Sequence, residues 1–275
     1  MRDFTLKTYR SLLQELKRKN YTFVRFDEFL DSKKSDSGSE SGMTMILRHD
    51  VDRRPSNALK MAKLEKELGI IGSYYFRIVP ESFDVEIIKQ IAEMGYEIGY
   101  HYEEMSSPLL VSPKGGEISL DERMDRAWEL FKENLERIRK VAEVKTICPH
   151  GSPLSPFSNQ HIWDKYDYKE LGITGDAHLD TNWDEVGYLT DTGRRWDGDS
   201  VSVRDKAPSS VLPPRGRKFK STFDIIQALE NDQFPQKVMI NVHPERWNDN
   251  IFWWTEELIS QNIKNVIKKH FFVKR

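Results

Sequence analysis

The stretch Met43-Thr-Met-Ile-Leu-Arg-His-Asp-Val-Asp52 begins as a buried strand would and ends in charged residues. Charged side chains are rarely buried unless they are paired or bind a metal. In an α/β sheet, ligands bind at the carboxyl ends of the strands. Asp50 and Asp52 point to the same side of an extended chain, so they are expected to hold a cation or to divide cation binding and proton transfer between them. The alternative is structural: the two residues cap the next helix, with Arg53 and Arg54 as charge partners.

Outward from this strand, the sequence predicts alternating helices and strands. Helices are expected over 55–68 and 84–94 and in the long segment that Ser119 opens. Strands are expected over 70–79, 96–101, 145–148, 173–178, 186–189 and 237–242. Strands that alternate with helices indicate a parallel sheet with right-handed crossovers. The fold class is therefore α/β.

The two ends of the chain are predicted to be helical. Residues 1–30 are expected to form an N-terminal helical extension, and residues 31–42 a flexible surface loop, because that segment holds only Asp, Ser, Lys, Gly and Glu. Residues 255–269 are expected to form an amphipathic helix that buries Leu258, Ile259, Ile263, Val266 and Ile267. The whole chain, 1–275, is expected to be a single domain.

Composition narrows the classes of function. The formal charge is 42 − 44 = −2, which argues against a nucleic-acid partner. Cys148 is the only cysteine, so no intrachain disulfide is expected and a reducing compartment fits. We find no apolar run long enough for a membrane span and no signal-peptide core near Met1, so a cytoplasmic location is expected. Composition leaves the oligomeric state open.

Reactive side chains follow four of the expected strands. Asp50 and Asp52 end the first of them, and His101, His150 and His243 end three others, so three of the seven histidines occupy such positions. A single histidine at a strand end is commonly a hydrogen-bonded structural residue. Four strand ends on one face of a parallel barrel, however, would gather these groups into one pocket. Mixed Asp and His ligands suit a divalent metal such as Zn²⁺.

The order of these motifs resembles the polysaccharide deacetylases with NodB homology, carbohydrate esterase family 4. The resemblance runs from about Met43 to His243. It implies a distorted (β/α)-barrel of about seven strands and one divalent metal, with zinc expected first and cobalt, nickel or manganese as alternatives. It also implies a carbohydrate or sugar-derived substrate, from which N-acetyl or O-acetyl groups are removed.

The resemblance assigns roles to individual residues. Asp50 resembles the catalytic base, Asp52 the aspartate that binds metal, and His101 a metal ligand. Val51 separates two aspartates that are adjacent in the family, so the reverse assignment of base and ligand stays open.

The second metal-binding histidine of the family is missing. Its position holds Met105, a poor ligand for a hard divalent ion. Glu103, Glu104 or His150 is expected to take its place.

Further residues are expected near the substrate. His243 resembles the histidine that protonates the leaving group. Pro149, His150 and Gly151 stand where the family has an Arg and a Pro. Arg48 and the segment around Asp191 are also candidates; the full set of expected substrate contacts is Arg48, Pro149, Gly151, Asp191, Arg195, Trp196 and Trp247. For the tryptophans the alternative is an ordinary core position, and for the 191–197 segment a surface turn with internal ion pairs.

The resulting hypothesis is a metal-dependent hydrolase that deacetylates an amino sugar or a polysaccharide precursor. Met105 motivates a second hypothesis, a carbohydrate-binding relative that has lost its metal. A third hypothesis keeps the barrel and the metal but hydrolyses a C–N bond outside sugars.

Overall fold

The computed structural model describes residues 2–34, 42–108, 110, 118–152, 155–196 and 219–271, with side chains as far as residue 266. The strands are β1 (Thr22–Val24), β2 (Thr44–Val51), β3 (Ser73–Phe76), β4 (Glu97–Tyr102), β5 (Thr146–Pro149), β6 (Gly175–Asp176), β7 (Gly187–Thr190) and β8 (Lys237–Val242). The helices are α1 (Leu6–Arg18), α2 (Phe26–Lys34), α3 (Pro55–Glu67), α4 (Val85–Glu93), α5 (Leu120–Arg139), α6 (Thr222–Glu230) and α7 (Ile251–Phe271). Most of the predicted loop, residues 35–41, lies outside the described residues, as does Asp197.

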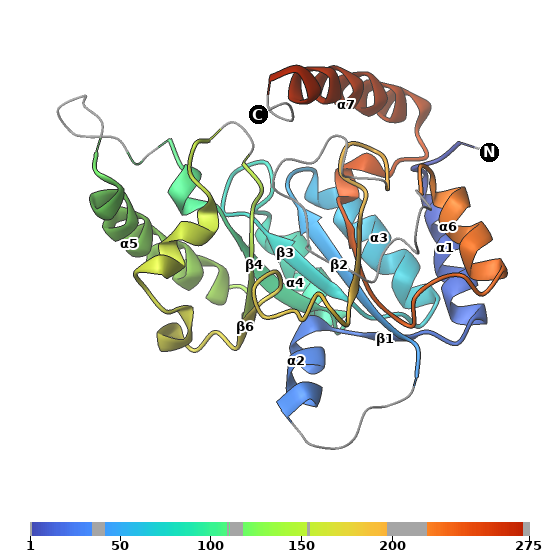
Figure 1. The fold of residues 1–275 in the computed structure, drawn as a ribbon, viewed down its shortest axis with the longest axis horizontal. Coiled ribbons are helices and arrows are strands. Elements are labelled where there is room, and N and C mark those ends of the chain that lie inside the picture. Colours follow the sequence, from blue (N-terminus) through green and yellow to red (C-terminus); the bar gives the residue numbers. More distant parts are fainter. Residues whose placement is uncertain are drawn as a thin grey trace.

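The strands form one parallel sheet in the order β6-β5-β4-β3-β2-β8-β7, curled into part of a barrel with helices around it (Figure 1). This arrangement confirms the predicted distorted (β/α)-barrel and the seven strands of its path. β2 pairs with three other strands: β8 pairs with its residues 44–49, while β1 and β3 pair with residues 44–46 and 48–51 along the other edge. Because all pairs are parallel, the carboxyl ends of the strands share one edge of the sheet.

Local sequence explains where most helices begin. The side chains of Thr5, Asp84, Ser119 and Ser221 accept hydrogen bonds from the first turns of α1, α4, α5 and α6. Pro55 opens α3, where a residue without an N–H is tolerated. None of these helices is long and apolar enough to cross a bilayer, and the same holds for the others in the described part of the chain.

The N-terminal residues are part of the main body of the protein. Helix α1 packs beside α3 and α6 (Figure 1). Its residues Leu12, Leu13 and Leu16 are buried in a core cluster that also contains Val238 and Ile240 of β8. The segment from β1 onward then joins the sheet through β2.

Helix α2 extends beyond the predicted helical segment 1–30, because residues 31–34 were expected in a loop and are helical. Its N-terminus is capped from far along the chain, because the Glu97 carboxylate accepts hydrogen bonds from the backbone N–H groups of Phe26 (2.9 Å) and Asp27 (3.2 Å). Phe29 and Leu30 bury the inner side of the helix. A cap supplied from 70 residues away leaves no local pattern to recognise.

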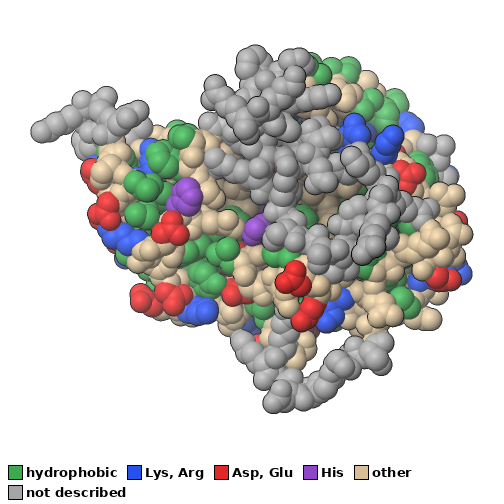
Figure 2. All heavy atoms as spheres, in the orientation of Figure 1, with side chains coloured by type: hydrophobic (Ala, Val, Ile, Leu, Met, Phe, Trp, Pro, Cys, Tyr) green, Lys and Arg blue, Asp and Glu red, His purple; other side chains and the backbone are tan. Residues whose placement is uncertain are grey.

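Helix α7 was predicted, but its orientation was predicted wrongly. Ile259, Ile263 and Val266 were expected inside and are 56–59% exposed, while Glu257 and Gln261 are buried. Figure 2 shows hydrophobic side chains, in green, at the top of the molecule, where Figure 1 places α7. The polar side of the helix therefore faces the protein. The side chain of Ile267, also expected inside, lies outside the described side chains.

A buried ionic network ties α1 and α3 to the sheet. The Glu65 carboxylate lies 2.9 Å from His49 Nε2 and accepts hydrogen bonds from the hydroxyls of Tyr9 (2.7 Å) and Tyr74 (2.9 Å). His49 Nδ1 lies 3.1 Å from the carbonyl oxygen of Ser73. Both histidine nitrogens thus lie within hydrogen-bond distance of oxygen atoms. None of these groups is exposed, so loss of one leaves the others without compensation.

We predict that Glu65→Gln lowers the free energy of unfolding by about 1–3 kcal/mol, because the amide nitrogen cannot accept one of the buried hydrogen bonds that the carboxylate accepts. Urea denaturation followed by circular dichroism measures the change. The matched control is Glu67→Gln in the same helix, which removes an exposed ion pair with Arg10. It should change stability by less than about 1 kcal/mol. Equal effects of the two substitutions would show that the Glu65 network does not stabilise the fold.

Candidate functional site

A cavity of about 930 Å³ opens at the carboxyl ends of the strands. All five residues predicted from the strand ends line it: Asp50, Asp52, His101, His150 and His243. They come from four parallel strands or from the residues directly after them. The convergence expected from a parallel sheet is therefore present.

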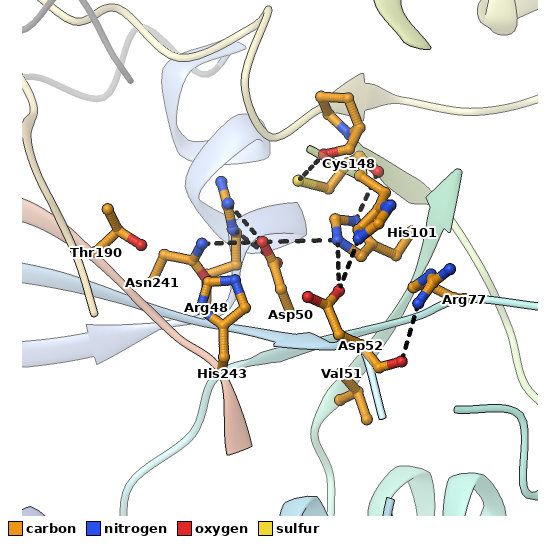
Figure 3. Close-up of polar contacts among 12 residues, drawn as sticks. Arg48, Asp50, Val51, Asp52, Arg77, His101, Cys148, Thr190, Asn241 and His243 are labelled. Carbon is orange, nitrogen blue, oxygen red and sulfur yellow. Dashed lines mark hydrogen bonds and ion pairs between the residues drawn. The ribbon is translucent and has the colours of Figure 1, made fainter. Parts of the chain in front are cut away.

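Asp52, His101 and His150 point toward one another (Figure 3 labels the first two). Asp52 Oδ1 lies 3.5 Å from His101 Nε2 and 3.4 Å from His150 Nε2. His101 Nδ1 lies 3.0 Å from the backbone carbonyl of Cys148. Nδ1 is thus placed to donate its hydrogen to this carbonyl, and Nε2 is the atom that faces Asp52.

These three atoms fit a divalent metal ion. Zinc binds nitrogen and oxygen at about 2.0–2.1 Å in a tetrahedron, so its ligand atoms lie about 3.4 Å apart. The separations of 3.4 and 3.5 Å match this geometry. Asp52 Oδ1 is also buried without a hydrogen-bond partner. A cation at this position would satisfy that oxygen.

His150 is held in place by two more residues of the cavity. Its Nδ1 lies 3.2 Å from Glu103 Oε2, and Arg77 binds the same carboxylate at 3.0 and 2.7 Å. Burial tends to raise the pKa of Glu103, but His150 and Arg77 outweigh it and lower the pKa to about 2. From the sequence, Glu103 was expected only as a possible metal ligand, and Arg77 was not among the expected site residues. The contact between Arg77 and Glu103 does not follow from their spacing in the sequence. It forms because Arg77 follows β3 and Glu103 follows β4, and these strands are neighbours.

Asp50 is fixed by a guanidinium and an amide (Figure 3). Arg48 donates to its two oxygens at 3.0 and 2.8 Å, and Asn241 donates at 2.9 Å. Burial tends to raise the pKa of Asp50, but the charges of Arg48, His101 and His243 lower it below its ordinary value. Arg48, expected at the substrate, lines the cavity, and its guanidinium donates hydrogen bonds to Asp50. Asn241 was not predicted, although it stands two residues before His243.

Cys148 borders the same site. As predicted, it is a small buried residue with 1% of its surface exposed. It also lines the cavity, and its sulfur lies within 4.8 Å of ligand atoms of Asp50 and His101. A soft donor therefore stands beside the harder Asp and His donors.

His243 is oriented by Asp191 on the strand end beside it. Asp191 Oδ1 lies 2.7 Å from His243 Nδ1, and Asp191 Oδ2 accepts a hydrogen bond from the His243 backbone N–H. Arg246 donates to the same carboxylate at 2.5 Å. Burial and Arg246 tend to lower the pKa of His243, but Asp191 and Asp52 raise it to about 9. Asp191, expected at the substrate, is fully buried and holds His243, and it is not among the described residues that line the cavity.

Both tryptophans expected at the substrate are core residues. Trp247 is 1% exposed, packs 5.0 Å from Phe4 and 5.2 Å from Tyr9 between ring centroids, and donates its indole N–H to Asp191. Trp196 is 3% exposed and donates to Thr222. Neither is among the described residues that line the cavity, and neither is Arg195. The alternative interpretation as core aromatics is the correct one.

Glu104 does not reach the metal ligands. It is buried against α5, where it accepts hydrogen bonds from the hydroxyl of Tyr100 and from Asn134. Burial raises its pKa to about 7. Met105, in the position of the missing histidine, is also fully buried. Of the three candidates to replace that histidine, His150 is the one placed beside Asp52 and His101. Pro149 and Gly151 line the cavity on either side of it.

We predict that Asp191→Asn lowers the pKa of His243 by about 1–3 units, because the mutation removes the adjacent negative charge. Proton NMR of the imidazole, on chelator-treated protein, measures the pKa. Asp232→Asn, on the surface beside Lys19, serves as the control and should leave the titration of His243 unchanged. A His243 pKa that is the same in wild type and Asp191→Asn would contradict the role given to Asp191.

No family model matches the chain, and no curated protein matches it. Solved structures do match. They include a CE4 family pseudoenzyme from Bacillus anthracis, with 13% sequence identity, 84% of this chain and 63% of that chain covered, and a TM-score of 0.41. This chain thus spans less than two thirds of that pseudoenzyme.

Two family 4 carbohydrate esterases also match. One is from Bacillus anthracis, with 11% identity, 94% of this chain and 87% of that chain covered, and a TM-score of 0.38. The other is PdaA from Bacillus subtilis, with 12% identity, coverage of 92% and 83%, and a TM-score of 0.37. These likenesses are distant, and the fold described above is established by its own strand order.

Proposed function

We propose that this protein is a metal-dependent hydrolase that removes acetyl groups from an amino sugar or a polysaccharide precursor. The observation that carries the proposal is the arrangement of Asp52, His101 and His150, with Asp50 and His243 lining the same cavity. A proton acceptor, a proton donor and a set of metal ligands are the groups that a metal-dependent hydrolase of amides or esters uses. The motif resemblance to polysaccharide deacetylases points to the same chemistry.

Asp52, His101 and His150 would hold the metal, and zinc suits their two nitrogens and one oxygen. A divalent ion bound there would polarise the acetyl carbonyl and lower the pKa of a nearby water. Glu103 and Arg77 hold His150 in position for this role. His150, from the third motif, would thereby replace the histidine that Met105 displaces.

Asp50 would accept the proton of the attacking water. Its lowered pKa keeps it ionised at neutral pH. The hydrogen bonds from Arg48 and Asn241 fix the direction of its carboxylate. A fixed base near the reacting atoms contributes through orientation as well as through proton affinity.

His243 would donate a proton to the leaving group. Asp191 occupies its Nδ1, so Nε2 is the atom left for the cavity. Because the pKa of His243 is raised to about 9, the ring stays protonated at neutral pH. Activity should therefore fall as the pH rises through about 9, where the ring loses this proton.

We predict that the wild-type protein binds about one zinc per chain, and that Asp52→Asn and His150→Ala each weaken zinc binding by at least about 100-fold. Elemental analysis and calorimetric titration measure this. Glu104→Gln is the matched control, because Glu104 is a buried carboxylate close in sequence to His101 but bonded to Tyr100 and Asn134. Zinc loss in Glu104→Gln with retention in His150→Ala would reverse the assignment.

We predict acetate release from N-acetylglucosamine oligomers, with Asp50→Asn lowering kcat by about 10²–10⁴-fold at unchanged zinc content. The activity is measured with a coupled acetate assay across pH 5–10. Release of ammonia or a carboxylate from small amides, without activity on acetylated sugars, would favour the third hypothesis. A metal-free wild type that binds glycans without turnover would favour the carbohydrate-binding hypothesis.

A further inference from the structure

Glu245 is a carboxylate in the cavity that the proposed reaction does not use. It stands two residues after His243, in the 3-10 turn η5 (Pro244–Arg246) that follows β8. It lines the cavity, yet only 4% of its surface is exposed. Its Oε2 atom is buried without a hydrogen-bond partner.

Other carboxylates of this region have cationic partners. Asp50 binds Arg48, Glu103 binds Arg77, and Asp191 binds Arg246. Asp52 faces the two histidines of the metal group. The positive charge that most lowers the pKa of Glu245 belongs to Arg246, whose Nη1 donates a hydrogen bond to Asp191.

This position is costly for a carboxylate. Burial and the negative charge of Asp52 raise the pKa of Glu245 to about 7. An ionised group buried without a partner loses several kcal/mol of hydration free energy. A ligand that donates a hydrogen bond to Oε2 would remove this penalty, because none of the described residues donates one.

The chemistry next to His243 indicates which donor is needed. Hydrolysis of an N-acetyl group breaks the C–N bond; the hydroxyl of water goes to the acetyl carbon and the nitrogen is protonated. The products at neutral pH are acetate and an ammonium, so R–NH–CO–CH₃ and H₂O give R–NH₃⁺ and CH₃COO⁻. Hydrolysis of an O-acetyl group leaves a neutral alcohol instead. Hydrogen bonds between ionised partners are about twice as strong as neutral ones.

We infer that Glu245 binds the amino group of a 2-amino sugar beside His243, so that the substrate class is N-acetylated rather than O-acetylated. The inference rests on the proposed function for the position of the leaving group. Glu245 acts as a specificity residue: it stabilises the ammonium product and the nitrogen that is gaining positive charge.

The test compares two probes that differ in one group, glucosamine and glucose. Their dissociation constants are measured by ligand-observed NMR on the zinc-loaded full chain at pH 7. We expect wild type to bind glucosamine at least about tenfold more tightly than glucose, and Glu245→Gln to reduce this preference to about twofold or less. Glu81→Gln is the control, because Glu81 is an exposed carboxylate lining the same cavity. It should keep the preference.

Equal binding of glucosamine and glucose by the wild-type protein would contradict the inference. This outcome needs no variant, so the test remains decisive even if Glu245→Gln fails to fold. A preference that survives in a folded Glu245→Gln protein also overturns the inference. Acetate release and zinc content, measured on the same preparations, distinguish a failure of the inference from a failure of the proposed function. Normal deacetylation without an amine preference contradicts the inference alone. An amine preference that depends on Glu245 without any deacetylation contradicts only the proposed function.

Discussion

Three arginine–carboxylate pairs organise the site; two of them are buried, and the Arg77–Glu103 pair is partly buried. Arg48 holds Asp50, Arg77 holds Glu103 and through it His150, and Arg246 holds Asp191 and through it His243. Each pair fixes a different group of the proposed mechanism: the proposed base, a proposed metal ligand and the proposed acid. The pairing also keeps the carboxylates ionised in a cavity where burial alone would neutralise them. Removing one arginine would leave a buried charge uncompensated and release the group that it holds.

Two carboxylates of the cavity, Asp52 and Glu245, lie outside these three pairs. Asp52 has an oxygen with no hydrogen-bond donor and two histidine nitrogens 3.4–3.5 Å away, which is the environment that a cation requires. Glu245 has an oxygen that receives no hydrogen bond from the described residues, and it follows the proposed proton donor His243 by two positions, which suits a cationic substrate group. Carboxylates with an arginine partner thus position other protein groups, whereas Asp52 and Glu245 are the carboxylates that we propose bind a ligand.

The sequence predicted the convergence of strand ends because parallel strands share one direction. It could not choose between Glu104 and His150, since that choice depends on a short 3-10 turn that directs Glu104 toward Tyr100 and Asn134. Trp247 follows the His243 segment but is covered by Phe4 and Tyr9 from the distant N-terminus. The apolar stripe of α7 was visible, but periodicity shows only that a helix has two faces, not which face packs inward. Long-range contacts decide each of these cases.

The central claim is that Asp52, His101 and His150 together form the metal site, and anomalous diffraction at the zinc edge from zinc-loaded crystals tests it most directly. We expect one strong peak about 2.0–2.2 Å from Asp52 Oδ1, His101 Nε2 and His150 Nε2. A peak that joins His101 to Asp50 and the Cys148 sulfur, with His150 turned away, would contradict the assignment. So would zinc found only outside the cavity.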